Sequence, residues 1–346
     1  MTGTLLDGIS MHIVETPRLK AAVLERAAQG AHAKTVVFIH GNVSSSLFWQ
    51  PTMLALPSDV RAIAIDLRGF GDSETLPVDA TRGVRDFSDD VDSVLETLGI
   101  ERSNLVGWSM GGGVVLQYLL DHTDRVQTLT LVSPVSPYGF GATDGPDGHA
   151  LNAEFAGSGG GGGNPDFVQR LADGDTSDDP TSPRAIYRTT YVKDPSDATH
   201  EDLWVESMLS TKTGVDNYPG DGVPAESWPG FGPGTRGVLN TMAPKYFDVS
   251  GIVDLATKPP ILWVHGADDA IVSDTSLFDL NFLGQLGAIP GWPGAEVAPP
   301  QPMVSQTRSV FERYGDYDEV IYENCGHSAH LEHPEEFRSA LAAHLE

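Results

Sequence analysis

The sequence is poor in cysteine, in basic residues and in long apolar runs. Because Cys325 is its one cysteine, the chain can form no internal disulfide, and nothing in it favours an oxidising compartment. No run of about 18 or more apolar residues is present that could span a bilayer. The opening residues 1–16 lack the basic and apolar regions of a secretory signal. These absences predict a soluble, cytoplasmic protein that has no membrane partner.

Basic residues are outnumbered by acidic ones. Lys and Arg total 21 against 48 Asp and Glu, which gives a formal net charge of −27. Such a charge repels nucleic acid and anionic membranes, so neither is expected as a partner. The 346 residues, of which 40% are hydrophobic, suffice for one large α/β domain or two ordinary domains.

Residues 9–133 alternate short apolar runs with longer segments of helical periodicity. This alternation is typical of a largely parallel sheet with crossover helices. The apolar positions of residues 86–99 recur at helical spacing, and Gly99 is the residue expected to end that helix. Two later strands are expected in the segments ILWV and YDEVIY. The earlier expected strands are residues 9–15, 21–26, 35–40, 61–65, 104–108 and 128–132.

Residues 134–259 have a different texture, rich in Gly, Pro and Asp, with helices expected over 183–191 and 200–209. The glycine run at 157–163 is interpreted as a flexible tether. We therefore expect a core domain made of residues 1–133 and 260–346, interrupted by a cap at 134–259. The aromatic residues of the cap can line an apolar cavity or form the cap's own small core, and we expect most of them to do the latter.

The stretch GWSMG at residues 107–111 matches G-x-S-x-G and lies between an expected strand and an expected helix. A serine on such a turn is exposed above the edge of the sheet, while the glycines leave room where side chains would collide. The alternative is an ordinary serine in a glycine-rich loop. The strand before it and the helix after it favour Ser109 as a nucleophile.

A serine hydroxyl is a weak nucleophile, so it requires a base and a group that orients the base. His327 lies in a loop between the last expected strand and the last expected helix, which makes it the best candidate base. Asp268 and Asp269 follow the strand ILWV, where an orienting acid is expected. The resulting chain order is Ser, Asp, His.

The turn His40-Gly41-Asn42 follows another expected strand and could aim backbone N–H groups at an oxyanion. The N–H of Met110, the residue after Ser109, would be the second donor. Taken alone, this turn is more typical of a plain tight turn.

Together these segments resemble the α/β-hydrolase superfamily over essentially the whole chain. The resemblance rests on VVFIHGN, IAIDLRGFGDSE, LVGWSMGGGVVLQYL, ILWVHGADDAIV and CGHSAHLEHPEEF, in that order. It implies an α/β fold with a mostly parallel eight-stranded sheet, helices on both faces and an inserted cap that acts as a lid.

The resemblance also implies roles for individual residues. Ser109 is then the nucleophile and His327 the base, and Asn42 and Met110 supply the oxyanion hole. The acid is Asp269 rather than Asp268, because members of the superfamily usually carry it three residues after a glycine equivalent to Gly266.

The activity implied by the resemblance is that of a serine hydrolase. Its substrates would be fairly apolar carboxylic esters or lactones, cleaved through an acyl-enzyme without a metal or organic cofactor. The HGN turn is similar to that of haloalkane dehalogenases, but those enzymes and epoxide hydrolases use an aspartate where this chain has Ser109. A serine attacking an alkyl carbon would leave an inert ether, so both activities are rejected.

Several alternatives stay open at this point. They are hydrolysis of a carbon–carbon bond, cofactor-free haloperoxidase or perhydrolase activity, and non-catalytic binding of a small molecule. The oligomeric state, monomer or homodimer, is open as well.

His327, His330 and His333 have a spacing that could suggest a metal site. Pro334 is expected in the first turn of the last helix, so the three histidines would lie in a loop, and no metal site is predicted. His330 and His333 are interpreted as supporting or surface residues.

Asp66 and Arg68 follow a strand near the expected rim of the pocket, in a loop that glycines mostly shape. We do not expect either charged side chain to touch the substrate. Cys325, two residues before the candidate base, is interpreted as a packed thiol.

Overall fold

The computed structural model describes residues 4–30, 34–196 and 199–346, so the first three residues of the opening segment lie outside it. Eight strands form one sheet in the order β1-β2-β4-β3-β5-β6-β13-β14. Strand β2 is antiparallel to β1 and β4, and the remaining neighbours are parallel. The strands are β1 Ser10–Glu15, β2 Lys20–Arg26, β3 Lys34–Ile39, β4 Val60–Ile65, β5 Ser103–Trp108, β6 Val126–Val132, β13 Ile261–Gly266 and β14 Tyr317–Tyr322.

The expected strands are confirmed, each within two residues of its predicted ends. All six residues of β5 and of β13 are buried, because helices cover both faces of the sheet. A strand buried on both faces has no alternation of polar and apolar residues, which is why continuous apolar runs marked these strands in the sequence. The predicted fold class, a mostly parallel sheet with helices on both faces, is confirmed.

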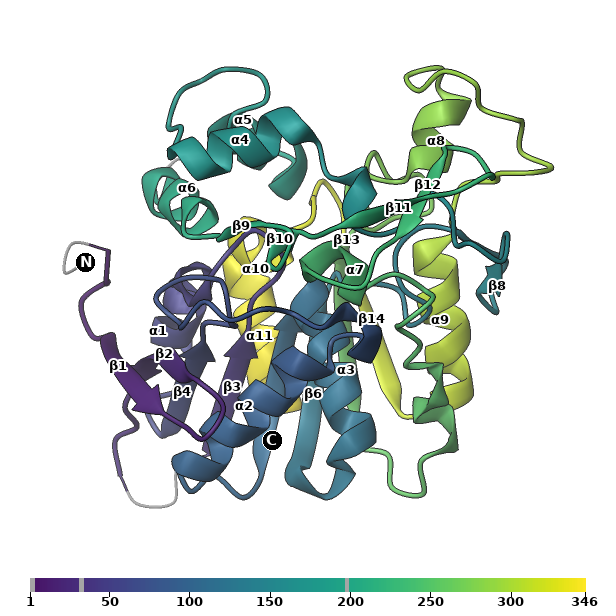
Figure 1. Cartoon of the computed structure of the whole chain (residues 1–346). Coiled ribbons are helices and arrows are strands. Elements are labelled where there is room, and N and C mark those ends of the chain that lie inside the picture. The colour runs from purple at the N-terminus through teal and green to yellow at the C-terminus, as the bar shows by residue number, and fades with distance from the viewer. Residues whose placement is uncertain (1–3, 31–33, 197–198) are drawn as a thin grey trace.

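The helices form two layers on the sheet (Figure 1). One layer contains α2 (Arg85–Thr97), α3 (Met110–Asp121), the short 3₁₀ helix η6 (Ser250–Asp254) and α9 (Met303–Tyr314). The other contains α1 (Gln50–Ala55) and α11 (Pro334–His344), with α10 (Ala329–Glu332) beside α11.

The helix ends agree with the sequence signals. Gly99 follows α2 with a φ of 67°, a left-handed conformation that glycine adopts without strain. Pro334 is the first residue of α11, as expected for a proline at a helix start. Within the described residues, no helix combines the length and apolar character needed to cross a membrane.

The cap lies above the carboxyl ends of the parallel strands (Figure 1). Helices expected over 183–191 and 200–209 are confirmed, while the helix α4 (Pro165–Asp173) was not expected. The helix α8 (Leu280–Gln285), from the segment after β13, lies on the same side. The cap elements are β7 Thr143–Asp144, β8 His149–Ala150, η4 Gly160–Gly162, α4 Pro165–Asp173, α5 Pro183–Ile186, the π-helix η5 Tyr187–Tyr191, α6 Glu201–Leu209, β9 Thr213–Gly214, β10 Tyr218–Pro219, β11 Gly222–Pro224, β12 Phe231–Pro233 and α7 Val238–Thr241. Three further 3₁₀ turns belong to the core: η1 Ser46–Trp49, η2 Ala80–Arg82 and η3 Thr123–Arg125.

The glycine run 157–163 is packed, and the prediction of a flexible tether is wrong. The N–H of Gly160 donates to Asn240 Oδ1 at 2.9 Å. A Cβ on Gly160 would lie 2.3 Å from the carbonyl oxygen of Asp221, and one on Gly161 would lie 2.5 Å from the ring of Phe231. Glycine is required here because the backbone packs closely against the β11–β12 hairpin, whereas the sequence shows only that side chains are missing.

Candidate active site

Ser109 occupies the turn between β5, which ends at Trp108, and α3, which begins at Met110. Its φ of 56° and ψ of −120° are unusual for a residue with a side chain and mark a strained turn. The turn is held in place because the Ser109 N–H donates to the carbonyl of Val132 at 2.9 Å, and the Val135 N–H donates to the carbonyl of Ser109 at 3.1 Å. These two hydrogen bonds therefore hold the strained backbone of Ser109 in place.

The glycines around Ser109 are required by close backbone approach. A Cβ on Gly107 would lie 2.4 Å from the carbonyl oxygen of Gly111. A Cβ on Gly111 would lie 2.4 Å from the carbonyl oxygens of Ile39 and His40. The G-x-S-x-G pattern thus allows α3 to cross directly beneath β3 and β5.

His327 and Asp269 form a buried pair although 58 positions separate them in the chain. The distance from His327 Nδ1 to Asp269 Oδ2 is 2.8 Å, and both side chains are almost completely buried. The other carboxylate oxygen, Oδ1, accepts the N–H groups of Ile271 at 2.7 Å and Val272 at 2.9 Å. These bonds hold the carboxylate in the orientation that directs the second ring nitrogen of His327 away from Asp269.

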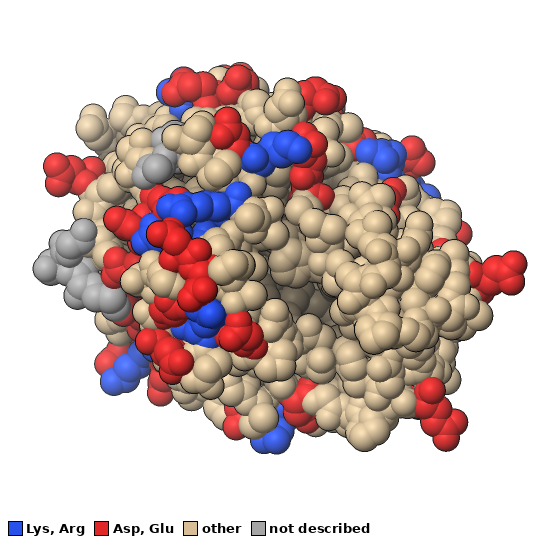
Figure 2. All heavy atoms as spheres, turned by 90° about the horizontal axis from the view of Figure 1, so that it is seen from above, with Lys and Arg blue, Asp and Glu red and all other residues tan. Residues whose placement is uncertain are grey.

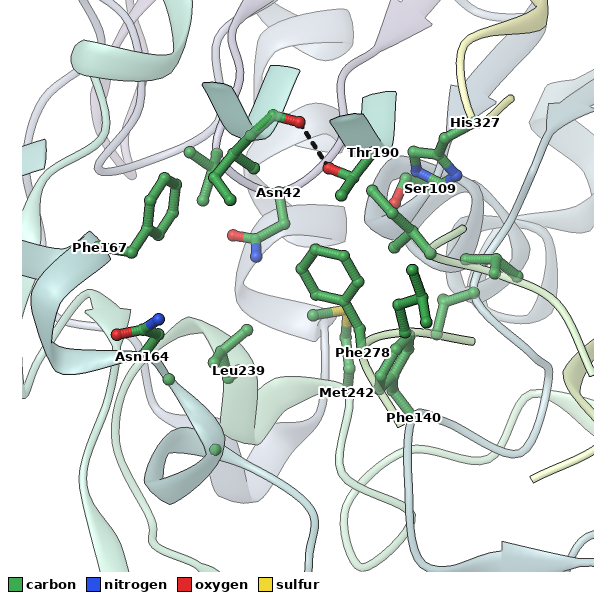
Figure 3. A pocket seen from close by; sticks show the side chains of 18 of the residues that line it. Asn42, Ser109, Phe140, Asn164, Phe167, Thr190, Leu239, Met242, Phe278 and His327 are labelled. Carbon is green, nitrogen blue, oxygen red and sulfur yellow. Dashed lines mark hydrogen bonds between the residues drawn. The ribbon is translucent and has the colours of Figure 1, made fainter. Parts of the chain in front are cut away.

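The ring of His327 lies beside Ser109 (Figure 3). Its loop is attached to the nucleophile turn, because the indole N–H of Trp108 donates to the carbonyl of His327 at 3.0 Å. Asp268 has a different environment: its side chain is 37% exposed and pairs with Lys193 Nζ at 3.0 Å. Of the two adjacent carboxylates, the structure brings Asp269 to His327.

The loop after β3 contains the predicted oxyanion residue Asn42. His40 Nδ1–H donates to the carbonyl of Gly41 at 2.7 Å, and its Nε2 accepts the N–H of Leu67 at 3.0 Å. Burial lowers the pKa of His40 to about 4, so it stays neutral and keeps this pair of hydrogen bonds. A Cβ on Gly41 would lie 3.0 Å from the Cβ of Ser109, so this loop passes directly against the nucleophile.

Met110, the second predicted oxyanion residue, is the first residue of α3. The first N–H groups of a helix have no acceptor within the helix, and they favour negative charge. The N–H of Met110 is therefore available in the turn that carries Ser109. The structure brings together all five predicted site residues, Asn42, Ser109, Met110, Asp269 and His327, at the carboxyl edge of the sheet.

A pocket of about 410 Å³ opens beneath the cap, with Ser109, His327 and Asn42 in its wall. Seen from above, a hollow lies between one half of the surface with many charged residues and another half with few (Figure 2). Helix α4, η5 and the glycine run contribute to the wall, as do residues 271–283, which the sequence analysis assigned to the core domain.

None of the described residues that line this pocket is Asp, Glu, Lys or Arg. Two aromatic residues of the cap, Phe140 and Tyr218, line it. Phe167, Tyr191 and Phe278 also line it and were not anticipated. Figure 3 shows Phe167 and Phe278. The lining described is therefore mostly apolar and has no acidic side chain, lysine or arginine.

Phe167, one of the lining residues that were not anticipated, lies in a helix whose start can be recognised in the sequence. Asn164 accepts the N–H of Asp166 and caps α4, and Pro165 opens the helix. Phe167 and Leu171, spaced by four, form its buried face. This Asn-Pro start with an i, i+4 apolar pair predicts an amphipathic helix. Tyr191 ends the helix expected over 183–191, but nothing in the sequence placed its ring in the pocket, and no comparable signal marked Phe278.

Asp66 and Arg68 are not among the residues that line this pocket. Asp66 accepts the N–H of Ser46 at 2.7 Å and the N–H of Asp72 at 2.9 Å, and burial raises its pKa to about 6. The guanidinium of Arg68 binds Asp90 at 2.6 Å. Both side chains hold loops together.

The three histidines of the last loop have separate environments. The ring of His330 is buried, 4.4 Å from the ring of Trp49 and 5.0 Å from that of Trp108. The ring of His333 stacks on Tyr322 at 4.9 Å. With His327 paired to Asp269, the three rings do not converge on one point. Cys325 is buried, which raises the pKa of its thiol and agrees with a packed side chain.

A family model described as "alpha/beta hydrolase fold" matches residues 34–334. A carboxylesterase, YbfK, of Bacillus subtilis (strain 168) is 30% identical over 126 residues, which are 36% of this chain and 41% of that protein. A putative carbamate hydrolase, RutD, of Caulobacter sp. (strain K31) is 36% identical over 100 residues, 29% of this chain and 37% of that protein.

These sequence matches span only about two fifths of the length of those relatives. Solved structures match over nearly the whole chain. A putative aryl esterase from Burkholderia cenocepacia superposes with a TM-score of 0.60 at 20% identity, covering 96% of this chain and 97% of that one. The carboxylesterase CesB (YbfK) from Bacillus subtilis gives a TM-score of 0.57 at 18% identity, covering 99% and 93%. Because both sequence identities are 20% or lower, these superpositions show a shared fold and nothing about activity.

Proposed function

The chain belongs to the alpha/beta hydrolase fold family, and from this premise we propose that it is a serine hydrolase that cleaves carboxylic esters or lactones. The observation that carries the proposal is the geometry around Ser109. This serine lies on a strained strand–helix turn in the wall of an apolar pocket, beside a histidine whose Nδ1 is 2.8 Å from Asp269.

The reaction follows from this arrangement. Ser109 Oγ attacks the carbonyl carbon while His327 takes its proton, and Asp269 keeps the imidazole oriented and stabilises its charged form. The backbone N–H groups of Asn42 and Met110 stabilise the oxyanion. His327 then gives the proton to the leaving alcohol, which departs. Water attacks the acyl-enzyme in the same way and releases the acid.

The identity of the nucleophile and the lining of the pocket limit the substrates. A serine forms an ester with an acyl group, which water can cleave, so a carbonyl carbon is required. A pocket of about 410 Å³ with no charged lining residue among those described suits an uncharged, fairly apolar molecule of small to medium size. Carbamates, which the relative RutD is named for, contain the same kind of carbonyl.

A direct test uses a fluorophosphonate probe and p-nitrophenyl esters and lactones of graded chain length. We expect labelling of the folded protein at Ser109 and hydrolysis that Ser109→Ala abolishes. Absence of labelling in folded protein would favour a non-catalytic binding role. A preference for carbon–carbon substrates or for perhydrolysis in the same screen would favour those alternatives instead.

The two adjacent carboxylates provide a matched pair of variants. Asp269→Asn is expected to lower kcat by about 10³-fold or more, because the imidazole loses its orienting carboxylate. Asp268→Asn removes an exposed ion pair with Lys193, so its effect should stay below about fivefold. The reverse order of effects would show that the acid is Asp268.

A further inference from the structure

Residues 191–194 begin at Tyr191, the last residue of the π-helix η5 of the cap, and contact the loops that carry the proposed catalytic groups. We call these four residues the cap strap. Its first residue, Tyr191, is buried, and its ring lies 5.7 Å from that of Trp108 and 6.3 Å from that of His327. The strap therefore belongs to the insertion in sequence and to the site in space.

The hydroxyl of Tyr191 donates to the oxyanion loop. Its oxygen lies 3.1 Å from the carbonyl oxygen of Asn42 and 3.1 Å from that of Val43. Burial raises the pKa of Tyr191, so the hydroxyl keeps its proton and remains a donor. A side chain of the cap thus binds the backbone of the residue whose N–H is proposed to stabilise the oxyanion.

This loop needs such support because Val43 has a φ of 47°. The left-handed region is unfavourable for a side chain branched at Cβ, and such a conformation persists only where neighbouring contacts impose it. The two carbonyls that Tyr191 binds flank the strained residue on both sides. Loss of the hydroxyl would leave these carbonyls without this donor and let the loop relax.

Glu332 connects the strap to the loop of the base. Its Oε2 accepts the backbone N–H of Lys193 at 2.6 Å, and its Oε1 accepts the N–H of Gly326 at 2.8 Å. The contact is so close that a Cβ on Gly326 would lie 2.8 Å from the nitrogen of Lys193. Gly326 directly precedes His327, so the carboxylate attaches the cap to the residue before the base.

We propose that the cap strap positions the oxyanion loop and the histidine loop for catalysis, with Tyr191 and Glu332 as positioning residues. The inference rests on the proposed hydrolase function. It assigns to the cap a role beyond covering the pocket, because part of the insertion supports the catalytic geometry. A movement of the cap that admits substrate must then leave the strap in place.

The first test is Tyr191→Phe, with kcat counted per active site titrated by fluorophosphonate. We expect kcat for p-nitrophenyl butyrate to fall about tenfold while KM changes less than about twofold, because the oxyanion forms only after binding. Phenylboronic acid, whose adduct with the serine is tetrahedral, should bind about tenfold more weakly. A purely structural role would lower the fraction of active sites and leave both values unchanged per site.

The matched control is Tyr246→Phe, which removes a cap hydroxyl outside the pocket lining. A second variant, Glu332→Gln, keeps the size of the side chain but replaces one of its two accepting oxygens with an NH₂ group. Because NH₂ cannot accept a hydrogen bond, the side chain can no longer bind the N–H groups of both Lys193 and Gly326. We expect it to lower kcat about fivefold, while Glu335→Gln on the exposed start of α11 does not. If Tyr191→Phe does not fold, Glu332→Gln still tests the strap.

Two failures are distinguishable. If the wild-type protein neither reacts with fluorophosphonate nor hydrolyses esters, the proposed function fails. If the wild type is active and both Tyr191→Phe and Glu332→Gln keep its kcat and its affinity for phenylboronic acid, the positioning role of the strap is overturned.

Discussion

At the level of single residues, the surroundings of a side chain decide its chemistry more than its type does. His327 and His330 are three positions apart, yet one pairs with Asp269 and the other packs between two tryptophan rings. Both ring nitrogens of His330 are buried and have no hydrogen-bond partner among the described residues. His330 is therefore held neutral by its environment, and protonation is costly.

The buried ring of His330 should make the folded protein less stable in mild acid. Burial, and next the charge of His327, lower the pKa of His330 to about 3 in the folded protein, against about 6.5 in the unfolded chain. Between these values the unfolded chain binds a proton that the folded chain does not, so stability is lost as the pH falls. From about pH 7 to about pH 5, this residue should cost about 2 kcal/mol.

His330→Phe removes that dependence, and chemical denaturation at both pH values measures it. The fall in the free energy of unfolding between the two should shrink by about the same 2 kcal/mol. His149→Gln, at an exposed position of β8, serves as the control. An unchanged pH dependence in His330→Phe would contradict the assignment of a neutral, buried ring.

At the level of secondary structure, apolar runs and turn residues predicted most of the elements. The eight strands of the sheet, α2, α11 and two cap helices have clear periodicity or end signals, because burial and backbone conformation are encoded locally. The glycine run was misread. A glycine that allows free motion and one that permits close packing look the same in a sequence, and only the neighbouring chain distinguishes them.

The packing of the glycine run can be tested with two variants of one tract. Gly160→Ala should destabilise the protein by about 2 kcal/mol, because the new Cβ would lie 2.3 Å from the backbone oxygen of Asp221. In Gly162→Ala the nearest atom is 3.8 Å away, so the change should stay within about 0.5 kcal/mol.

Urea denaturation of both variants measures these differences. A flexible tether would tolerate both substitutions equally. Equal stability of Gly160→Ala and Gly162→Ala would therefore restore the interpretation drawn from the sequence.

At the level of the whole molecule, the charge of −27 is large for 346 residues. Ion pairs such as Arg68 with Asp90 neutralise part of it, but Lys and Arg are too few to pair with every acidic group. The excess negative charge repels itself more strongly in the compact state than in the unfolded chain. Around the pocket, by contrast, one half of the surface has few charges (Figure 2).

Salt should therefore stabilise this protein. Raising NaCl from about 0.02 M to about 0.5 M at about pH 7 shortens the screening length several-fold, and Tm should rise by a few degrees. Closer to the isoelectric point of about 4.5, the same change should have a smaller effect. Thermal melts in both salts at both pH values measure this. A fall in Tm with salt at neutral pH would mean that ion pairs outweigh the repulsion.

The sequence by itself determined the order of strands and helices, the strained turn at Ser109 and the loop positions of Asn42 and His327. These features depend on residues close together in the chain, through burial, glycine spacing and backbone conformation. The resemblance already favoured Asp269 over Asp268, and the structure pairs Asp269 with His327. The tertiary structure alone decided what the glycine run packs against and that Tyr191 and Glu332 join the cap to the site. The pair of Asp269 and His327 joins residues 58 positions apart, and the contact of Tyr191 with Asn42 joins residues 149 positions apart. Such contacts depend on the paths of whole loops, which no local pattern records.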